Sequence, residues 1–291
     1  MIDPKDDRRH PPGPQALWNE SYWFACYDPR ERIGVMTRMG LLVNKKQANV
    51  WFAISKDGQV VHDATNLDCP LPEGDIENLT IGGVFYQCRE PLRTWRLLYN
   101  QGGYAIDLLW RGFMPVFDYG HEQSFIPSMA ANHLEQSGEV EGTVTIAGQS
   151  YAIKTIGHRD HSWGERDWTS TRGWYWVEAQ FDKGFAFNAY RLFLRDGTEK
   201  TGGFLFDGQN MMGIQRAEIT LDTGDHFGPQ RSATVRILDE QGRLHQIVGC
   251  VLGVCPVNLG ETNCDDAFAA FEMGGKAGYG IIELGYQHQK V

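Results

Sequence analysis

The sequence predicts an all-β protein whose strands are mostly antiparallel and form a sandwich or a barrel. Short runs of alternating apolar and polar residues recur every ~8–15 residues, and glycine-containing turns separate them. The 34 glycines exceed average usage, which fits many tight turns. No glycine-rich phosphate-binding motif follows a strand, so nucleotide-binding α/β folds are excluded. A length of 291 residues suits two domains or one large sandwich.

Individual hairpins can be followed along the chain, because Asx-Gly and related pairs between alternating apolar residues mark tight turns. The clearest strand pairs are 50–54 with 59–61, 143–146 with 150–153, and 177–181 with 185–190. Helical periodicity is scarce. We expect one or two helical turns within 124–136 and a short helix over 265–271, and a flexible tail over the proline-rich residues 1–14.

Charge and composition exclude several classes of partner. The net charge is −10, and no basic stripe is present, so binding to nucleic acid or to an anionic membrane surface is not expected. The one compact basic cluster, residues 8–10, follows two aspartates that neutralise it locally. The longest apolar run, 247–257, is too short to span a bilayer. No signal-peptide pattern is visible, and a cytoplasmic location is expected.

The six cysteines form no CxxC pair, and we expect reduced thiols in the core rather than disulfides or a zinc site. The nine tryptophans are the second unusual feature of the composition. Five of them lie in apolar strand patterns and are expected in the core: Trp18, Trp23, Trp51, Trp95 and Trp110.

Residues 157–168, Gly-His-Arg-Asp-His-Ser-Trp-Gly-Glu-Arg-Asp-Trp, concentrate more ionisable side chains than any other stretch. They follow an alternating run directly, so the first half is expected to continue that strand. Strand alternation then places odd-numbered side chains, among them His161 and Trp163, on one face and even-numbered ones, among them Asp160, on the other. Gly164 permits a bend or bulge.

Other interpretations of this segment stay open from the residues alone. Arg159 and Asp160 belong to a set of alternating charges that could form a buried ion-pair network. A metal site with His158, His161 and Asp160 is disfavoured, because alternation sends the two histidines to opposite faces. A serine hydrolase is disfavoured, since no GxSxG is present and Ser162 lacks the flanking glycine of a nucleophile elbow. We predict no metal and no cofactor.

The sequence Arg-Asp-His-Ser-Trp-Gly at 159–164, followed by Arg-Asp-Trp at 166–168, resembles the signature of the carotenoid 1,2-hydratase (hydroxyneurosporene synthase) and AttH-like superfamily. The chain looks like an uncharacterised, lipocalin-like branch of it. Trp-Asn-Glu-Ser-Tyr-Trp at 18–23 and Gly-Tyr-Gly-Ile-Ile-Glu at 278–283 are weaker matches. The resemblance covers residues 16 to 285.

This resemblance implies two packed, lipocalin-like antiparallel β-barrel (calycin-like) domains with few short helices, here residues 15–168 and 169–291. It implies an apolar cavity and cofactor-free chemistry on isoprenoid or polyketide-like substrates, by hydratases, cyclases or Diels–Alderases. Where the hydratases usually carry Asn, this chain has Ser162, and their acid on a later strand has no residue-for-residue match here.

Acid-initiated alkene chemistry needs a positioned acid, exclusion of water and aromatic faces toward the developing cation. A carboxyl group in an apolar pocket has a raised pKa and can hold its proton. The family pattern assigns His161 and Trp163 to the site. The candidate catalytic residues are Asp160, His161, Asp167 and Glu178. The candidate substrate-binding residues are Trp163, Trp168, Trp174, Trp176, Tyr190 (also a possible phenolic donor) and Glu20.

The leading hypothesis is a cofactor-independent lyase (hydratase or dehydratase) or isomerase/cyclase that acts on a hydrophobic, unsaturated, terpenoid-like small molecule. The main alternative is a non-catalytic, lipocalin-like carrier of such a ligand, and a scaffolding module with filled barrels is a third. The expected partner is the small molecule, without nucleic acid or a membrane span. A homodimer stays open.

Overall fold

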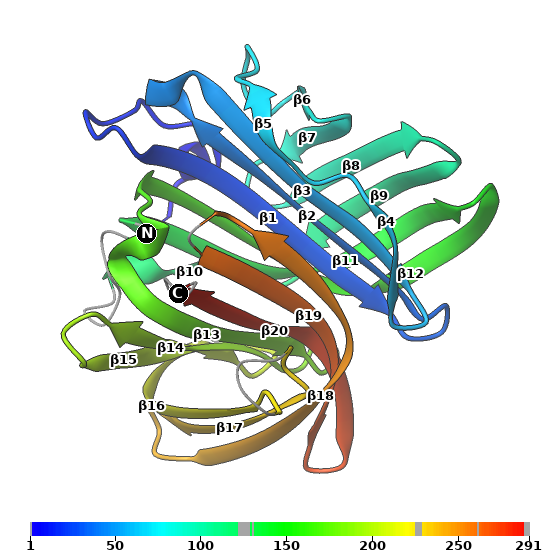
Figure 1. Cartoon of the computed structure of the whole chain (residues 1–291). Coiled ribbons are helices and arrows are strands. Elements are labelled where there is room, and N and C mark those ends of the chain that lie inside the picture. Colours follow the sequence, from blue (N-terminus) through cyan, green and yellow to red (C-terminus); the bar gives the residue numbers. More distant parts are fainter. Residues whose placement is uncertain (1, 122–128, 130, 225–228, 261, 288–291) are drawn as a thin grey trace. The chain divides into compact units, whose positions relative to one another are not determined.

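The protein is described from a computed structural model (Figure 1). The structure describes residues 2–121, 129, 131–224, 229–260 and 262–287. The chain divides into two compact units: unit 1 comprises Met1–Lys56, Val60–His121 and Ile126–Arg166, and unit 2 comprises Asp57–Gln59, Glu122–Phe125 and Asp167–Val291. Antiparallel strands make up most of both units, which confirms the predicted all-β class. The division into two domains, residues 15–168 and 169–291, stays a prediction.

Unit 1 contains a 12-stranded antiparallel sheet. Its strands are β1 (Trp18–Asp28), β2 (Ile33–Leu42), β3 (Gln47–Lys56), β4 (Gln59–Asp63), β5 (Asn66–Pro70), β6 (Leu79–Ile81), β7 (Val84–Glu90), β8 (Thr94–Gln101), β9 (Tyr104–Gly112), β10 (Phe117–Asp118), β11 (Asn132–Ile146) and β12 (Gln149–Glu165). Three 3₁₀ turns accompany them: η1 (Pro4–Asp7), η2 (Val43–Lys45) and η3 (Tyr119–His121).

The hydrogen-bonded path of this sheet runs β4-β3-β2-β1-β12-β11-β9-β8-β7-β6, with β5 beside β3 and β10 beside β11. The first strand of the unit therefore pairs with its last, and Figure 1 shows β1, β2 and β3 running alongside β12 and β11. This long-range pairing brings the N-terminal residues to the charged segment of β12.

The two faces of this sheet carry different side chains. Tyr22 and Phe24 of β1 point into a large apolar cluster with β7, β8 and β9, and we call this the core face. Ser21 and Trp23 point to the opposite side, which we call the polar face. Nearly all of β1 is buried, on both faces. Every polar group in this region therefore needs a partner within the protein.

Unit 2 is a closed antiparallel barrel whose strands follow one another in sequence order (Figure 1). They are β13 (Thr171–Gln180), β14 (Ala186–Leu194), β15 (Glu199–Phe206), β16 (Met211–Asp222), β17 (Ser232–Asp239), β18 (Leu244–Asn258), β19 (Thr262–Met273) and β20 (Lys276–Gln287). The turn η4 (Trp168–Ser170) precedes them. Val177, Phe187 and Ile282 belong to the apolar cluster that fills the barrel.

The helix expected over 265–271 is wrong, because these residues lie inside β19. Most of this strand is buried on both faces, so its sequence lacks the apolar–polar alternation that identifies a half-buried strand. The helical turns expected within 124–136 fall partly outside the described residues, and residues 132–136 begin β11 instead.

Residues 1–14 were expected to form a flexible tail, and the structure places part of this segment inside unit 1. Asp7, at the end of η1, is fully buried. The prediction that the two preceding aspartates neutralise the basic residues 8–10 was also wrong. Arg8 pairs with Glu77, and Arg9 donates a hydrogen bond to the carbonyl of Gly74. Asp7 is left to pair with a residue far along the chain.

The remaining expectations about composition can be compared directly. Of the five tryptophans predicted in the core, Trp23, Trp51, Trp95 and Trp110 are buried, whereas Trp18 is only partly buried. The six cysteines are free thiols, and all but Cys250 are buried. Among the helical segments of the described part of the chain, none has the length and apolar character needed to traverse a bilayer.

Unit 2 contains a carboxylate whose removal tests the structure. The buried Asp239 accepts hydrogen bonds from the side chains of Arg243 and His245, at 2.8 and 2.9 Å, and from the backbone N–H groups of Gln241 and Arg243. Burial alone would raise the pKa of Asp239, but the hydrogen bonds from His245 and Arg243 outweigh it and hold the pKa well below its usual value.

We predict that Asp239→Asn lowers the free energy of unfolding by about 2 kcal/mol at pH 7, because buried donors lose a charged acceptor. A depressed folded-state pKa stabilises the protein above the unfolded pKa of about 4, and this stabilisation disappears as the pH falls further. In urea unfolding, the difference in free energy of unfolding between Asp239→Asn and wild type should therefore be largest at pH 7 and shrink at pH 4 and below. Glu240→Gln, at an exposed position of the same hairpin, is the control. A difference that does not shrink with pH contradicts the prediction.

Candidate active site

Strand β12 alternates as the sequence predicted. Its register pairs His161 with Tyr22 and Asp160 with Trp23. The ring of His161 stacks on that of Tyr22 on the core face, with ring centres 3.9 Å apart and an angle of 11°. Asp160 lies on the polar face. The two residues predicted to act together as acid and histidine therefore point to opposite sides of one strand.

On the polar face, Glu135 of β11 lies between two histidines. Its Oε1 is 2.9 Å from Nε2 of His133, and its Oε2 accepts a hydrogen bond from Nε2 of His158. The other ring nitrogen of His158, Nδ1, is 2.9 Å from the hydroxyl of Ser137. All four side chains are buried, so this network fixes both rings in a water-poor environment.

Asp160 adjoins this network and is the one carboxyl of the group that stays partly open, with 22% of its side chain exposed. Its Oδ2 lies 3.9 Å from Nε2 of His133. Burial raises the pKa of Asp160, against the opposing charges of Arg166 and Arg38. Burial also lowers the pKa of His133, and the hydrogen bond to Glu135 only partly offsets this. Both shifts favour the uncharged forms, a carboxylic acid beside a neutral imidazole.

Aromatic side chains flank this acid across the sheet. The register places one row of neighbouring side chains on the polar face, in the order Trp51, Arg38, Trp23, Asp160, Glu135 and Phe117. The guanidinium of Arg38 lies over the ring of Trp51, 4.5 Å from its centre. The two neighbouring rows on this face carry His133 and His158 beside the smaller residues Ser21 and Ala25. The acid thus lies beside an indole and between two rows that each contain a histidine.

On the core face, Glu20 joins two other histidines. Its Oε1 lies 2.8 Å from Nδ1 of His10 and 3.0 Å from Nε2 of His161. Its Oε2 accepts a hydrogen bond of 2.8 Å from the backbone N–H of His10. Burial would raise the pKa of Glu20, but the hydrogen bonds from His10 and His161 lower it overall. Trp163 stacks on His10, with ring centres 3.9 Å apart. The predicted residues Glu20, His161 and Trp163 are thus brought together.

A buried ion pair completes the core face. Nη1 of Arg159 donates to Oδ1 of Asp7 over 2.7 Å, and both side chains are essentially inaccessible to solvent. Nε and Nη2 of Arg159 donate to Oε1 of Gln136, at 3.1 and 3.0 Å. Arg159 also lies 5.1 Å from the ring centre of Trp110. The alternative interpretation, a buried ion pair, is therefore found for Arg159. Its partner is Asp7 rather than Asp160 or Asp167.

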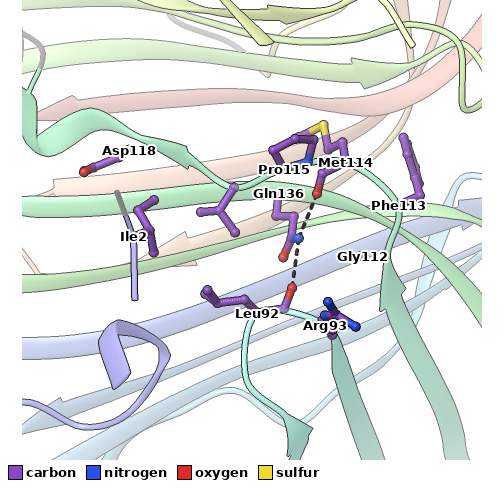
Figure 2. A pocket seen from close by; sticks show the side chains of 10 residues that line it. Ile2, Leu92, Arg93, Gly112, Phe113, Met114, Pro115, Asp118 and Gln136 are labelled. Carbon is purple, nitrogen blue, oxygen red and sulfur yellow. Dashed lines mark hydrogen bonds between the residues drawn. The ribbon is translucent and has the colours of Figure 1, made fainter. Parts of the chain in front are cut away.

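Gln136 links this ion pair to a pocket of about 580 Å³ in unit 1. Figure 2 shows its amide group inside the pocket, where Nε2 donates to the carbonyls of Leu92 and Met114 at 3.0 and 2.9 Å. The lining is mainly apolar: Ile2, Leu92, Arg93, Gly112, Phe113, Met114, Pro115, Val116, Asp118 and Gln136. The volume lies within the range of small-molecule sites.

The other predicted site residues lie in unit 2. Asp167 caps η4, where its Oδ1 accepts hydrogen bonds from the backbone N–H and the hydroxyl of Thr169. This contact gives Asp167 a structural role in a turn. Trp168 stacks on Trp174, with ring centres 5.6 Å apart, and Trp174 donates to Glu283.

Four of the predicted residues share one face of the barrel of unit 2. Trp174, Trp176 and Glu178 alternate along β13 with Val177 and Ala179, which belong to the barrel core. Tyr190 pairs with Trp176 across β14, and the two rings stack with centres 5.4 Å apart. The buried Glu178 accepts a hydrogen bond from Gln180.

Sequence reasoning missed five residues of these clusters: Asp7, His10, His133, Glu135 and His158 as a partner of Glu135. Two of them carried a usable signal, because the spacing of His133 and Glu135 puts both side chains on one face of a strand. That segment was assigned to a helix instead. Asp7 and His10 lay in the presumed tail, and their partners could not be predicted without the pairing of β1 with β12.

Three groups in the described part of the chain have donor atoms within 4.8 Å of one another, close enough to hold a metal ion together. They are His10–Glu20–His161, His133–Glu135–Asp160 and Cys264–Asp266–Glu283.

Comparison with known proteins places this arrangement in a family. A family described as "Domain of unknown function (DUF7064)" matches residues 3–288, which is nearly the whole chain. The chain belongs to this family. No curated protein matches this chain.

Solved structures share the fold of this DUF7064 protein at low sequence identity. A protein from Nitrosomonas europaea that carries the provisional name AttH superposes with a TM-score of 0.70 and 14% identity, over 98% of this chain and 96% of that one. CghA superposes with a TM-score of 0.65 and 10% identity, over 95% and 90%. CghA with Sch210972 gives 0.66 and 10%, over 94% and 89%. These similarities establish the fold and confirm its likeness to AttH.

The buried pair of Asp7 and Arg159 gives a stability prediction. Asp7→Ala leaves the guanidinium buried without its carboxylate, so we expect the free energy of unfolding to fall by about 3–5 kcal/mol. Glu73→Ala, at an exposed position between β5 and β6, should change it by less than about 0.5 kcal/mol. Denaturant unfolding of both variants measures the difference. Equal stabilities would show that the N-terminal segment does not pair with Arg159 in solution.

Proposed function

We propose that this protein is an enzyme that transforms a hydrophobic, unsaturated small molecule of the isoprenoid type, with Asp160 as the proton donor. The observation that carries the proposal is the position of Asp160, a partly open carboxyl at the edge of the buried His133–Glu135–His158 network and beside Trp23. The reaction class would be hydration or dehydration, isomerisation or cyclisation.

In the proposed first step, the carboxyl proton of Asp160 moves to one alkene carbon. The π electrons of the substrate form the new C–H bond, the O–H bond breaks toward oxygen, and a carbocation remains at the more substituted carbon. Hydration follows when water attacks this carbon and its proton passes to a neutral imidazole such as that of His133. Loss of a neighbouring C–H proton to the Asp160 carboxylate gives an isomer. Attack by a second alkene forms a ring and moves the cation to that alkene, where loss of a C–H proton to the same carboxylate ends the reaction.

The surroundings of Asp160 fit these demands. An indole face next to the acid stabilises a nearby cation, and Trp23 is the immediate cross-strand neighbour. Glu135 orients His133, as a carboxylate orients the imidazole in other acid–base sites. Nε2 of His133 lies 3.9 Å from Oδ2 of Asp160, so the imidazolium formed by deprotonating water would return a proton to the carboxylate through one bridging water.

The comparisons support a small-molecule role without naming the substrate. CghA, which has the same fold, has been solved with Sch210972. In unit 2, Trp168, Trp174, Trp176 and Tyr190 stay predicted substrate-binding residues, and Asp167 and Glu178 stay predicted catalytic residues.

The second candidate function is the non-catalytic carrier, and the apolar pocket in Figure 2 favours it. That pocket offers about 580 Å³ lined mainly by aliphatic and aromatic side chains, and Asp160 and His133 are not part of its wall. A ligand held there would meet no acid–base pair.

The enzyme hypothesis predicts that a panel of terpenoids and carotenoids incubated in deuterated water gains deuterium, or one water, in the presence of the protein. Asp160→Asn should lower the rate by about 10²–10⁴-fold, because it removes the acid and keeps the shape. Asp68→Asn, an exposed aspartate of β5, is the matched control. Mass spectrometry follows the products, and circular dichroism checks folding. Turnover that survives Asp160→Asn rules out Asp160 as the donor.

The carrier hypothesis predicts a different mutational pattern. Val116→Trp fills the pocket and should weaken ligand binding at least about tenfold, whereas Asp160→Asn should leave binding unchanged. Tryptophan fluorescence or calorimetry with the same panel measures both variants. Tight binding without turnover, lost in Val116→Trp, would establish the carrier. Turnover that is insensitive to Val116→Trp would exclude this pocket as the reacting site.

A further inference from the structure

We propose that the core face of unit 1 holds a divalent transition-metal ion, with Zn²⁺ as the best match, bound by His10, Glu20 and His161. This site is independent of the proposed acid chemistry, because the three side chains lie on the face of β12 opposite to Asp160. Two imidazoles and one carboxylate are donors that Zn²⁺ takes in proteins.

The geometry brings the three donor atoms to one point. Nδ1 of His10 and Nε2 of His161 both lie against Oε1 of Glu20, at 2.8 and 3.0 Å, and all three atoms are within 4.8 Å of one another. Ligands of a tetrahedral ion with bonds of about 2.0–2.1 Å stand roughly 3.3 Å apart. The two contacts of Glu20 with the histidines would each have to lengthen by a few tenths of an ångström to admit the ion.

Neighbouring side chains hold the ligands in place. His161 is stacked on Tyr22 and His10 on Trp163, both nearly parallel at ring-centre distances of 3.9 Å. Oε2 of Glu20 is fixed by the backbone N–H of His10, which leaves Oε1 for the ion. Such support of the ligands by their surroundings is a regular property of metal sites.

The second ring nitrogen of His161 gives the most specific argument. Nδ1 is buried and has no hydrogen-bond partner among the described residues, and its nearest carboxylate oxygen is Oδ1 of Asp7, at 3.9 Å. When Nε2 of His161 donates its proton to Glu20, Nδ1 carries no proton and its lone pair faces the carboxylate of Asp7. Metal binding at Nε2 requires the other tautomer, in which Nδ1–H points toward Asp7. The carboxylate–histidine–metal arrangement thus resolves an unfavourable contact.

The charges on the core face also favour a cation. Asp7 is matched by Arg159, so the ion pair contributes no net charge, and Glu20 supplies one negative charge to the ion. His10 has 20% of its side chain exposed, whereas the other two ligands are inaccessible, so an ion would enter from the His10 side. Three protein ligands leave a fourth position for water.

The two other groups with suitable spacing are weaker candidates. In His133–Glu135–Asp160, the carboxylate of Glu135 also binds His158, which lies outside the group, so an ion would have to break that contact. In Cys264–Asp266–Glu283, burial raises the pKa of the Cys264 thiol well above its usual value, which opposes the thiolate that a metal needs.

Zinc titration of the full-length protein tests the site. The protein is first stripped of metal with a chelator, and its Zn²⁺ binding is then measured by competition with a chromophoric chelator. We expect one Zn²⁺ per chain with a dissociation constant below about 1 µM, and a rise in melting temperature when Zn²⁺ is added. Co²⁺ substituted for Zn²⁺ should give visible absorption bands that report nitrogen and oxygen ligands.

Two variants and a matched control identify the ligands. Glu20→Gln keeps the size of the side chain and an acceptor for His161, and His10→Ala truncates a partly exposed residue, so both should fold by circular dichroism. Each should weaken Zn²⁺ binding by more than about 100-fold and abolish the thermal shift. His62→Ala, a partly buried histidine of β4, should bind like wild type. Wild-type protein that takes up no Zn²⁺, or variants that bind it as tightly as wild type, would overturn the proposal.

Discussion

The organisation of unit 1 depends on one constraint: the charged half of β12 is buried on both faces, so each of its ionisable side chains must find a partner inside the protein. Arg159 and His161 obtain theirs from residues near the N-terminus, Asp7 and Glu20. His158 obtains its partner, Glu135, from β11 on the other face. These pairings explain why residues before β1 are packed into the unit.

Because this strand is buried on both faces, each face of the sheet has its own cluster of ionisable side chains. On the polar face, a shared carboxylate binds two histidines, and burial raises the pKa of the neighbouring Asp160. On the core face, two histidines converge on one carboxylate whose pKa is lowered. The first arrangement suits proton transfer to a substrate, and the second suits a cation. Neighbouring residues of a single strand, Asp160 and His161, thereby belong to different clusters.

Local patterns predicted what is local in this structure. The alternation of β12 followed from period-2 geometry, and the hairpin turns gave the all-β class, because both are set by residues close in sequence. Glu20 and His161 were both predicted site residues, but their hydrogen bond was not predicted. By contrast, His133 and Glu135 were assigned to a helix, and His10 to a tail. The physical reason is that β11 is buried on both faces near its start and lacks alternation, while the partners of His10 are chosen by the long-range pairing of β1 with β12.

That pairing also sets an order of events during synthesis. β1 hydrogen-bonds to β2 on one side, which emerges from the ribosome immediately after it, and to β12 on the other, with Trp18 opposite Glu165. Non-local strand pairs of this kind form late and slow the folding of β-proteins. An early meander of β1, β2 and β3 therefore presents β1 as an open sheet edge, a template for association with other chains. The nascent chain carries this exposed edge until residue 165 has left the exit tunnel.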